Sequence, residues 1–130
     1  MKFLVTGING TVGGNVFRQL LNHPEYEIWG ISKNKYKYRD NLPDYARNRT
    51  FALDMRRELP EVLSAGYFDV VIHAAAITPK NINQGNPYDD NVLLAKTLCH
   101  YLNNTKTQLF FLSTGSVYAE TSFICKENAA

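Results

Sequence analysis

Three glycines near the start of the chain have a spacing that suits phosphate binding. They lie in Thr6-Gly7-Ile8-Asn9-Gly10-Thr11-Val12-Gly13, directly after the apolar run Phe3-Leu4-Val5. A strand that ends in a glycine-rich turn and continues into a helix directs backbone N–H groups and the positive helix end at one point. Gly7 permits the tight turn, Gly10 leaves room for a ligand, and Gly13 lets the helix pack closely on the strand. The spacing predicts a site for the pyrophosphate of a dinucleotide.

The residues that follow the turn predict the helix that this site requires. Apolar side chains recur at helical spacing and would form its buried face, at Val12, Val16, Phe17, Leu20 and Leu21. The predicted cradle therefore comprises Gly7, Asn9, Gly10, Thr11, Val12 and Gly13. The alternative is a glycine-rich helix start that binds no ligand.

Strand and helix patterns alternate along the rest of the chain. Strands are expected at about 2–6, 26–31, 50–53, 69–73 and 108–112, and helices at about 11–22, 59–65 and from Pro87 onward, with Asn86 as its N-cap. Right-handed crossovers then give an α/β fold, a Rossmann-type doubly wound parallel sheet with strand order 3-2-1-4-5. Ligands bind such sheets outside the carboxyl ends of the strands, where the order reverses.

Length and composition suit one globular domain over residues 1–130. The chain is 45% hydrophobic and carries a net charge of +2, which is too small to indicate a polyanionic partner. No segment has the uninterrupted apolar length of a membrane span, and no signal peptide is recognisable, so we expect a cytoplasmic protein. Cys99 and Cys125 form no Cys-x-x-Cys pair, which argues against a zinc site or a disulfide framework. Cys99 is expected in the core, on an apolar helix face.

The segment from Ser32 to Arg49 is basic. It holds six Lys or Arg against two Asp, a local charge of +4, interleaved with tyrosines. Such a composition could form a surface for single-stranded nucleic acid. A solvated loop between two strands is the simpler interpretation, and we predict no nucleic-acid partner.

Five motifs in order resemble a known family. They are the glycine turn, Leu53-Asp54, Asp69-Val70-Val71-Ile72-His73-Ala74-Ala75-Ala76, Asp90-Asn91-Val92 and Ser113-Thr114-Gly115-Ser116-Val117-Tyr118. Together they resemble the extended short-chain dehydrogenase/reductases, in particular the NAD-dependent epimerase/dehydratase group that acts on nucleotide sugars. The resemblance spans nearly the whole chain. It implies an N-terminal NAD(P)-binding portion, with the sugar-binding segment and the last strands of the family sheet absent.

The resemblance also implies roles for individual residues. Asp54 would accept a hydrogen bond from the adenine amino group, beside the backbone of Met55. Ala74, Ala75 and Ala76 would form a floor under the cofactor, Asp90 would contact the nicotinamide ribose, and Asn91 would support the site. Thr114 would be the catalytic residue that hydrogen-bonds the reacting substrate oxygen. Each of these residues also has an ordinary structural interpretation, as a cap, a tight-packing alanine or a first-turn helix residue.

The residues at the end of the second predicted strand bear on the choice between NAD and NADP. Members that use NAD usually have an acidic residue at the position of Ser32, to bind the adenosine ribose. Ser32 followed by Lys33 suits a 2′-phosphate better, through a hydroxyl donor and a cation. The sequence thus favours NADP weakly over NAD, and the alternative is that Lys33 merely begins a solvated loop.

The family's catalytic base is a tyrosine four residues before a lysine, and none of the tyrosines in these 130 residues has that partner. We therefore expect this chain alone to be inactive and its complete form to transfer hydride on a nucleotide sugar, with a homodimer as an expected assembly. A stand-alone module that senses NAD(P) without catalysis is the alternative, and a ligand-free interaction protein is a third.

Overall fold

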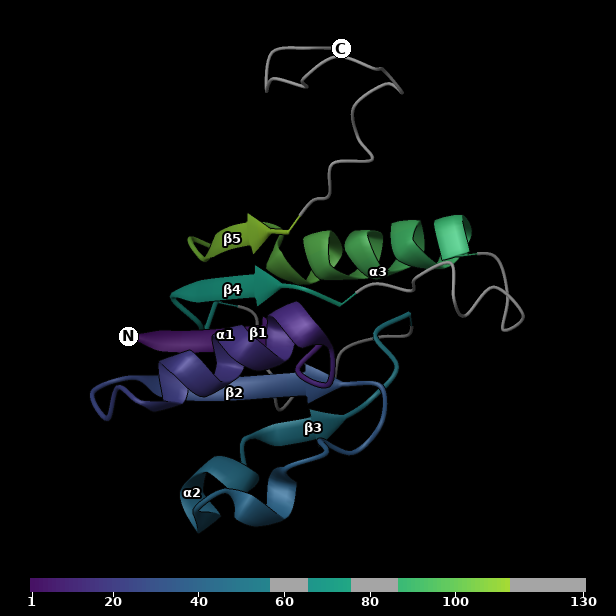
Figure 1. The fold of residues 1–130 in the computed structure, drawn as a ribbon. Helices are drawn as coiled ribbons and strands as arrows, with labels where there is room; N and C mark the ends of the chain where they lie inside the picture. Colours follow the sequence, from purple (N-terminus) through teal and green to yellow (C-terminus); the bar gives the residue numbers. More distant parts are fainter. Residues whose placement is uncertain (57–65, 76–86, 113–130) are drawn as a thin grey trace, which may run out of the picture.

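The chain folds into a parallel β-sheet covered by helices, as seen in a computed structural model that describes residues 1–56, 66–75 and 87–112 (Figure 1). The strands are β1 (Lys2–Thr6), β2 (Glu27–Ser32), β3 (Thr50–Ala52), β4 (Val70–His73) and β5 (Gln108–Phe111). All four pairings are parallel, and the order is β3-β2-β1-β4-β5. The predicted doubly wound α/β sheet and its order 3-2-1-4-5 are confirmed. The helix expected at 59–65 and the N-cap Asn86 lie outside the described residues.

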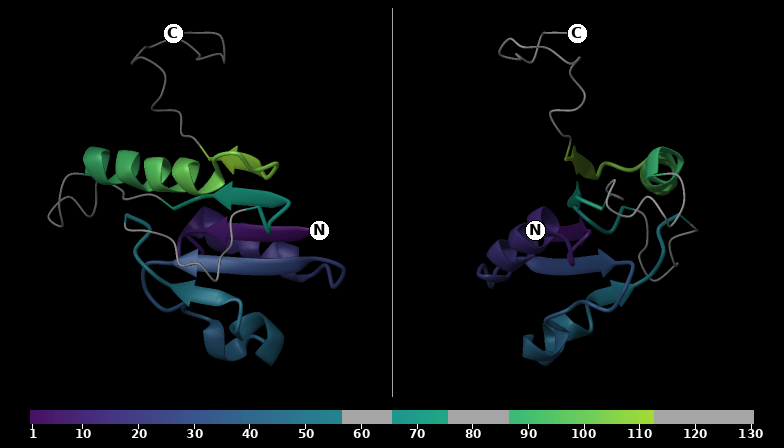
Figure 2. Two further views of the ribbon diagram at one scale, coloured as in Figure 1. Left: turned by 180° about the vertical axis from the view of Figure 1, so that it is seen from behind. Right: turned by 45° about the vertical axis from the view of Figure 1, so that its right-hand side comes forward.

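Two long helices cover opposite faces of this sheet (Figure 2). Helix α1 (Thr11–Leu21) connects β1 to β2, and α3 (Pro87–Leu102) connects β4 to β5. Alternate residues of β1 enter different cores because successive strand side chains point to opposite faces. Phe3 and Val5 pack with Phe17 of α1, whereas Leu4 packs with Leu98 of α3. The sheet is therefore buried on both faces around β1, which explains its apolar sequence.

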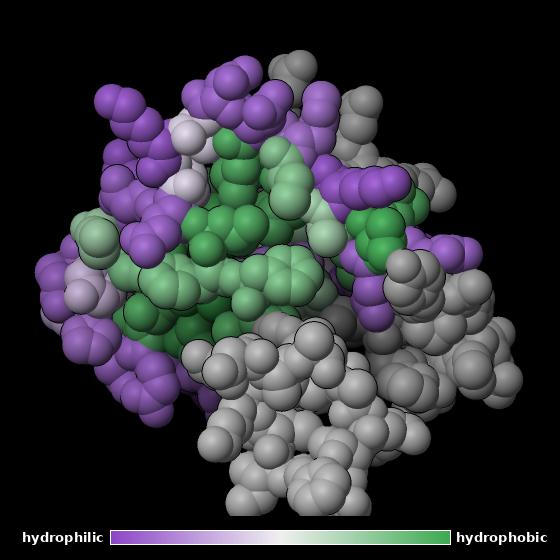
Figure 3. All heavy atoms as spheres, turned by 90° about the horizontal axis from the view of Figure 1, so that it is seen from above, coloured by the Kyte–Doolittle hydropathy of each residue, from purple (hydrophilic) through white to green (hydrophobic). Residues whose placement is uncertain are grey.

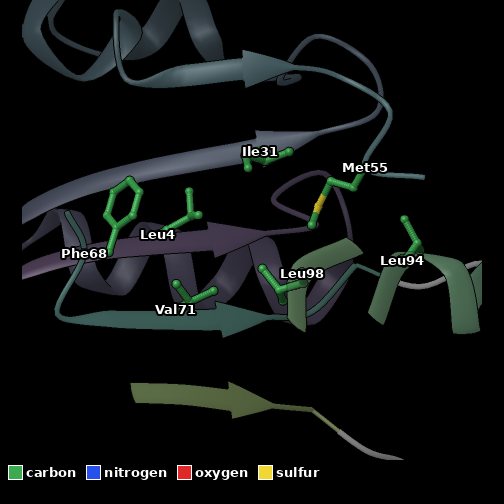
Figure 4. Close-up of a cluster of buried hydrophobic side chains, with 7 residues drawn as sticks. All are labelled: Leu4, Ile31, Met55, Phe68, Val71, Leu94 and Leu98. Carbon is green, nitrogen blue, oxygen red and sulfur yellow. The ribbon is translucent and has the colours of Figure 1, made fainter. Parts of the chain in front are cut away.

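The core on the α3 face continues to the edge of the predicted site. Figure 4 shows Met55 and Leu94 at the end of this cluster where the strand arrows point. Its buried members are Leu4, Ile31, Met55, Phe68, Val71, Leu94 and Leu98. The sequence predicts Met55 only as a backbone contact beside Asp54, but the residue is 3% exposed and its side chain belongs to this core. Packing of Met55 fixes the segment that follows β3.

Val12 and Cys99 are predicted from the sequence to be buried, but the structure exposes both. Val12 is 58% exposed because it lies in the first turn of α1, and the face of that helix toward the sheet is formed by Gly13, Gly14 and Phe17. Cys99 is also exposed, because Leu94 and Leu98 define the buried face of α3 and Cys99 follows Leu98 by one residue, about 100° around the helix. Helical periodicity predicts both helices but not the rotation of each against the sheet.

The basic segment is more ordered than a plain loop. It contains a 3-10 turn, η1 (Arg39–Asn41), and a short helix, α2 (Asp44–Arg47). Tyr36 is 3% exposed and packs edge-on against Phe17 of α1. Its hydroxyl has no hydrogen-bond partner among the described residues. The segment thus has an aromatic anchor of its own on the α1 face of the sheet.

The edge of the sheet at β5 is apolar and exposed. Phe110, Phe111 and Leu112 are each at least 40% exposed. Figure 3 looks down on this side of the molecule and shows hydrophobic side chains in green between hydrophilic ones in purple. None of the helices in the described ranges is long and apolar enough to cross a membrane.

Candidate functional site

A cavity of about 400 Å³ opens at the carboxyl ends of β1, β2 and β4. This is the position where the strand order reverses, because the chain leaves β1 toward β2 on one side and β4 lies on the other. The predicted residues that line the cavity are Gly7, Asn9, Gly10, Ser32, Lys33, Asp54, Met55, Ala74 and Ala75. The fold therefore brings together, in one cavity, motifs that lie up to 68 residues apart in the sequence.

The glycine turn is shaped by contacts that exclude side chains at two of its three glycines. Gly7 has φ +74°, and a Cβ there would lie 2.7 Å from the backbone nitrogen of Ala75. A Cβ on Gly13 would lie 2.2 Å from the carbonyl oxygen of Gly7. A Cβ on Gly10 would meet only that same oxygen, at 3.3 Å. Packing of the chain itself therefore demands glycine at positions 7 and 13, whereas position 10 faces the open cavity.

Helix α1 begins beside this cavity. Its N-cap is Gly10, and no side chain caps it there. The first N–H groups of a helix have no partner within the helix, and they carry the positive end of its dipole. Thr11 lies in a small adjoining hollow of about 190 Å³ rather than in the main cavity. A dinucleotide pyrophosphate fits the donors and the charge offered by the glycine turn.

A buried threonine and histidine shape the floor of the cavity. The hydroxyl of Thr6 accepts hydrogen bonds from the backbone N–H groups of Ala74 and Ala75, both at 3.1 Å. The same oxygen lies 2.8 Å from Nδ1 of His73. Burial lowers the pKa of His73 from its ordinary value, because it disfavours the charged form of the ring. His73 is 3% exposed, and its contact with Thr6 belongs to the buried support of the cavity floor.

The loop after β2 is fastened to the glycine turn by Asn9. Its side-chain amide donates to the carbonyl oxygens of Asn34, at 3.2 Å, and Lys35, at 3.0 Å, and its oxygen accepts from the backbone N–H of Lys37 at 2.9 Å. The hydroxyl of Ser32 donates to the carbonyl of Asn34, and Ser32 is 4% exposed. These bonds make Asn9 and Ser32 shape the cavity wall, and leave Lys33 as its exposed cation.

Asp54 and Asp90 are joined by an arginine that none of the sequence motifs includes. Arg56 Nη2 lies 2.6 Å from Asp54 Oδ2, and its Nη1 lies 3.3 Å from Asp90 Oδ2. Hydrogen bonds from Arg56 lower the pKa of Asp54 to about 2. Asp54 lines the cavity, whereas Asp90 and Asn91 are not among its lining residues.

The other predicted residues lie either beside the main cavity or outside the described residues. Gly13 lies under the turn and Val12 on its outer side, so both shape the helix start without lining the main cavity. Ala76 and Thr114 lie outside the described residues.

The lining residues that the motifs do not indicate are Ile31, Asn34, Leu53, Arg56 and Leu94. Only Arg56 carries a usable signal, because an arginine two residues after a strand-end aspartate can fold back onto it. Within the described residues no group of three metal-ligating side chains occurs.

Comparison with known proteins gives a family match over most of the chain. The family model of the NAD dependent epimerase/dehydratase family matches residues 3–130. Among solved structures, UDP-glucuronic acid 4-epimerase from Bacillus cereus in complex with NAD is 26% identical with a TM-score of 0.81, and the match covers 100% of this chain and 45% of that one. None of the curated proteins matches the chain.

Two further solved structures are similar in fold. A UDP-galactose 4-epimerase has a TM-score of 0.71 and 21% identity over 95% of this chain and 42% of its own. The UDP-glucose 4-epimerase of Thermus thermophilus, in complex with NAD, has a TM-score of 0.60 and 23% identity over 78% of this chain and 33% of its own. The chain therefore spans less than half the length of these structures.

Proposed function

Because the chain belongs to the NAD dependent epimerase/dehydratase family, we propose that it is the dinucleotide-binding portion of an enzyme that acts on a nucleotide sugar. The supporting observation is the cavity at the carboxyl ends of the strands, where the glycine turn, the start of α1 and Asp54 meet. We also propose that the complete enzyme is an epimerase, dehydratase or reductase of the extended short-chain dehydrogenase/reductase type.

Each part of the cofactor has a proposed place. The pyrophosphate would lie on Gly7, Gly10 and the first N–H groups of α1. The adenine would lie near Asp54, and Ala74 and Ala75 would form the floor below the ribose and pyrophosphate. When bound, the nicotinamide ring would accept and return a hydride. The residues of this chain would position the cofactor and bind its negatively charged pyrophosphate.

Calorimetric titration with NAD and with NADP tests the proposal. We expect saturable binding of at least one dinucleotide and no turnover of nucleotide sugars by residues 1–130 alone. An absence of heat with both would contradict the binding proposal, and measurable epimerase or reductase activity would contradict the catalytic part. An in-frame Tyr-x-x-x-Lys after codon 130 would support the enzyme, whereas a stop codon there would support the alternative of a non-catalytic sensing module.

We further propose a preference for NADP that depends on Lys33. Lys33 lines the cavity and is exposed, whereas the Ser32 hydroxyl already donates to Asn34. Lys33→Gln should weaken NADP binding about two- to fivefold, the effect of one solvent-exposed ion contact, and leave NAD binding unchanged. Lys35→Gln is the control, since Lys35 does not line the cavity. Equal effects of Lys33→Gln on both dinucleotides would refute a 2′-phosphate contact.

Two predictions concern the complete protein. We expect a cytoplasmic location, which cell fractionation tests. We also expect a homodimer, which light scattering on the full-length product tests; a monomer across the working concentration range would contradict it.

A further inference from the structure

One arginine connects two segments of the chain that are far apart in the sequence. Arg56 follows β3, and Asp90 lies in the first turn of α3. Besides the 2.6 Å contact of Nη2, Arg56 Nε lies 3.0 Å and 3.1 Å from the two carboxylate oxygens of Asp54. Its backbone N–H also donates to Asp54 Oδ1, at 3.0 Å. The Nη1 group then reaches Asp90 at 3.3 Å.

We propose that Arg56 is the positioning residue that sets how the cavity distinguishes the base of its dinucleotide, by holding the Asp54 carboxylate in one plane between β3 and α3. This inference rests on the proposed function, because it needs a dinucleotide in the cavity. Arg56 acts through Asp54 and is not itself a base ligand.

The geometry suits such a role. A guanidinium matches a carboxylate with a planar fork of donors, so the pair fixes an orientation as well as a charge. Three N–H groups of Arg56 contact the carboxylate, and the Nε–H is shared between its two oxygens, so one of about four acceptor positions is left for a further donor. Asp54 and Arg56 side chains are 26% and 27% exposed, so without the fork only the backbone N–H of residue 56 would hold the carboxylate against rotation toward water.

The second ion pair prevents the fork from swinging away. Asp90 is held on α3, whose buried face is fixed by Leu94 and Leu98. The Asp90 side chain is 19% exposed. Arg56 is thus held at both ends, by a carboxylate at the end of β3 and by one on a packed helix. Lys33, across the cavity lining, adds a weaker attraction to Asp54.

An ionised carboxylate in a fixed plane discriminates between bases by their exocyclic group. The 6-amino group of adenine is a donor and pairs with the carboxylate. Hypoxanthine has a carbonyl oxygen at the same position, which would face the carboxylate acceptor to acceptor. A carboxylate that can rotate away would lose the favourable contact with adenine and also relieve the unfavourable one with hypoxanthine.

The first experiment tests, without any ligand, whether Arg56 binds the Asp54 carboxylate. The pKa of the Asp54 carboxyl is followed by NMR titration in the wild type, Arg56→Ala and Arg47→Ala. Arg47 is the matched control because it pairs with Asp44 on the surface, away from the cavity lining. We expect the pKa of Asp54 to rise from about 2 toward its ordinary value of 3.8 in Arg56→Ala only. An unchanged value in Arg56→Ala would overturn the proposal.

The second experiment compares NAD with nicotinamide hypoxanthine dinucleotide in equilibrium binding. The wild type should prefer NAD, and Arg56→Ala should reduce that preference about three- to tenfold, the effect of ordering one side chain and its hydrogen bond. Arg56→Lys keeps the charge without the fork and should restore the preference only in part. Arg47→Ala should match the wild type.

The two proposals fail in different ways. If the wild type binds neither dinucleotide, the proposed function fails and this inference fails with it. If the wild type binds and Arg56→Ala weakens both dinucleotides equally, or Arg56→Lys behaves like the wild type, the proposed function stands and the positioning role of Arg56 is refuted.

Discussion

Alanine substitution at Gly10 and Gly13 should separate ligand binding from folding, although both glycines belong to the same turn. A Cβ on Gly13 would lie 2.2 Å from the carbonyl oxygen of Gly7 and 2.7 Å from its carbon. Both are backbone atoms at the end of β1, so they cannot rotate aside as a side chain would. Helix α1 would have to move away from the sheet and from the core around Phe17.

The magnitude follows from two opposing effects. Overpacking a close contact costs about 1–3 kcal/mol, and a backbone clash lies at the upper end, whereas alanine in a helix regains about 1 kcal/mol over glycine. We expect Gly13→Ala to lower the free energy of unfolding by about 2 kcal/mol, or the melting temperature by roughly 6–10 °C.

Gly10→Ala should behave in the opposite way. Gly10 has φ −81° and ψ 168°, which alanine adopts without strain, and its Cβ would meet one atom at 3.3 Å. The free energy of unfolding should change by less than about 1 kcal/mol. Dinucleotide affinity should fall at least about tenfold, because a displaced diphosphate loses backbone hydrogen bonds worth about 1.5–3 kcal/mol each.

Urea unfolding and calorimetric titration measure the two quantities. Trp29 is the only tryptophan in the chain and packs against Phe51 and Phe68, so its fluorescence reports the state of the core. Full stability of Gly13→Ala would refute the close contact between α1 and β1. Unchanged dinucleotide affinity of Gly10→Ala would refute the placement of the pyrophosphate.

Three further predictions concern buried polar groups and pH. Thr6→Val should lower the free energy of unfolding by about 2–3 kcal/mol in chemical denaturation, because it leaves two backbone N–H groups and His73 without their partner. Thr6→Ser keeps the hydroxyl and should retain most of the stability. Equal losses of stability in the two variants would contradict the role of the hydroxyl. Tyr36→Phe should leave stability unchanged or raise it by up to about 1 kcal/mol, since the hydroxyl is buried without a partner in the described residues, and a loss above that size would show that it has one. The pKa of Asp54 is lowered to about 2, so its ionised carboxylate stabilises the folded state above pH 3.8, and this contribution is lost as the pH falls toward 2. Asp54→Asn should therefore make the free energy of unfolding depend less on pH in that window. A pH profile identical to that of the wild type would exclude the ion pair with Arg56.

The elements of the fold were predictable because their signals are local. The glycine turn, the apolar strand at Val70–His73 and the periodicity of α1 predict the strands and helices within one or two residues. Strand order follows from the handedness of crossover connections. Most of the cavity lining was predictable for the same reason, since parallel strands bring their carboxyl ends to one edge.

The sequence by itself determined that this chain has a doubly wound α/β fold with a glycine-rich turn at the end of its first strand, where we propose that a dinucleotide binds, because turn chemistry and periodicity depend on near neighbours. Tertiary structure alone decided the rest. The orientation of α1 and α3 against the sheet exposes Val12 and Cys99. Packing of the loop after β2 places the Ser32 hydroxyl where it donates a hydrogen bond to the carbonyl oxygen of Asn34. The bridge from Asp54 through Arg56 to Asp90 joins residues 36 positions apart, and no local pattern specifies such a contact until the sheet has brought the ends of β3 and α3 together.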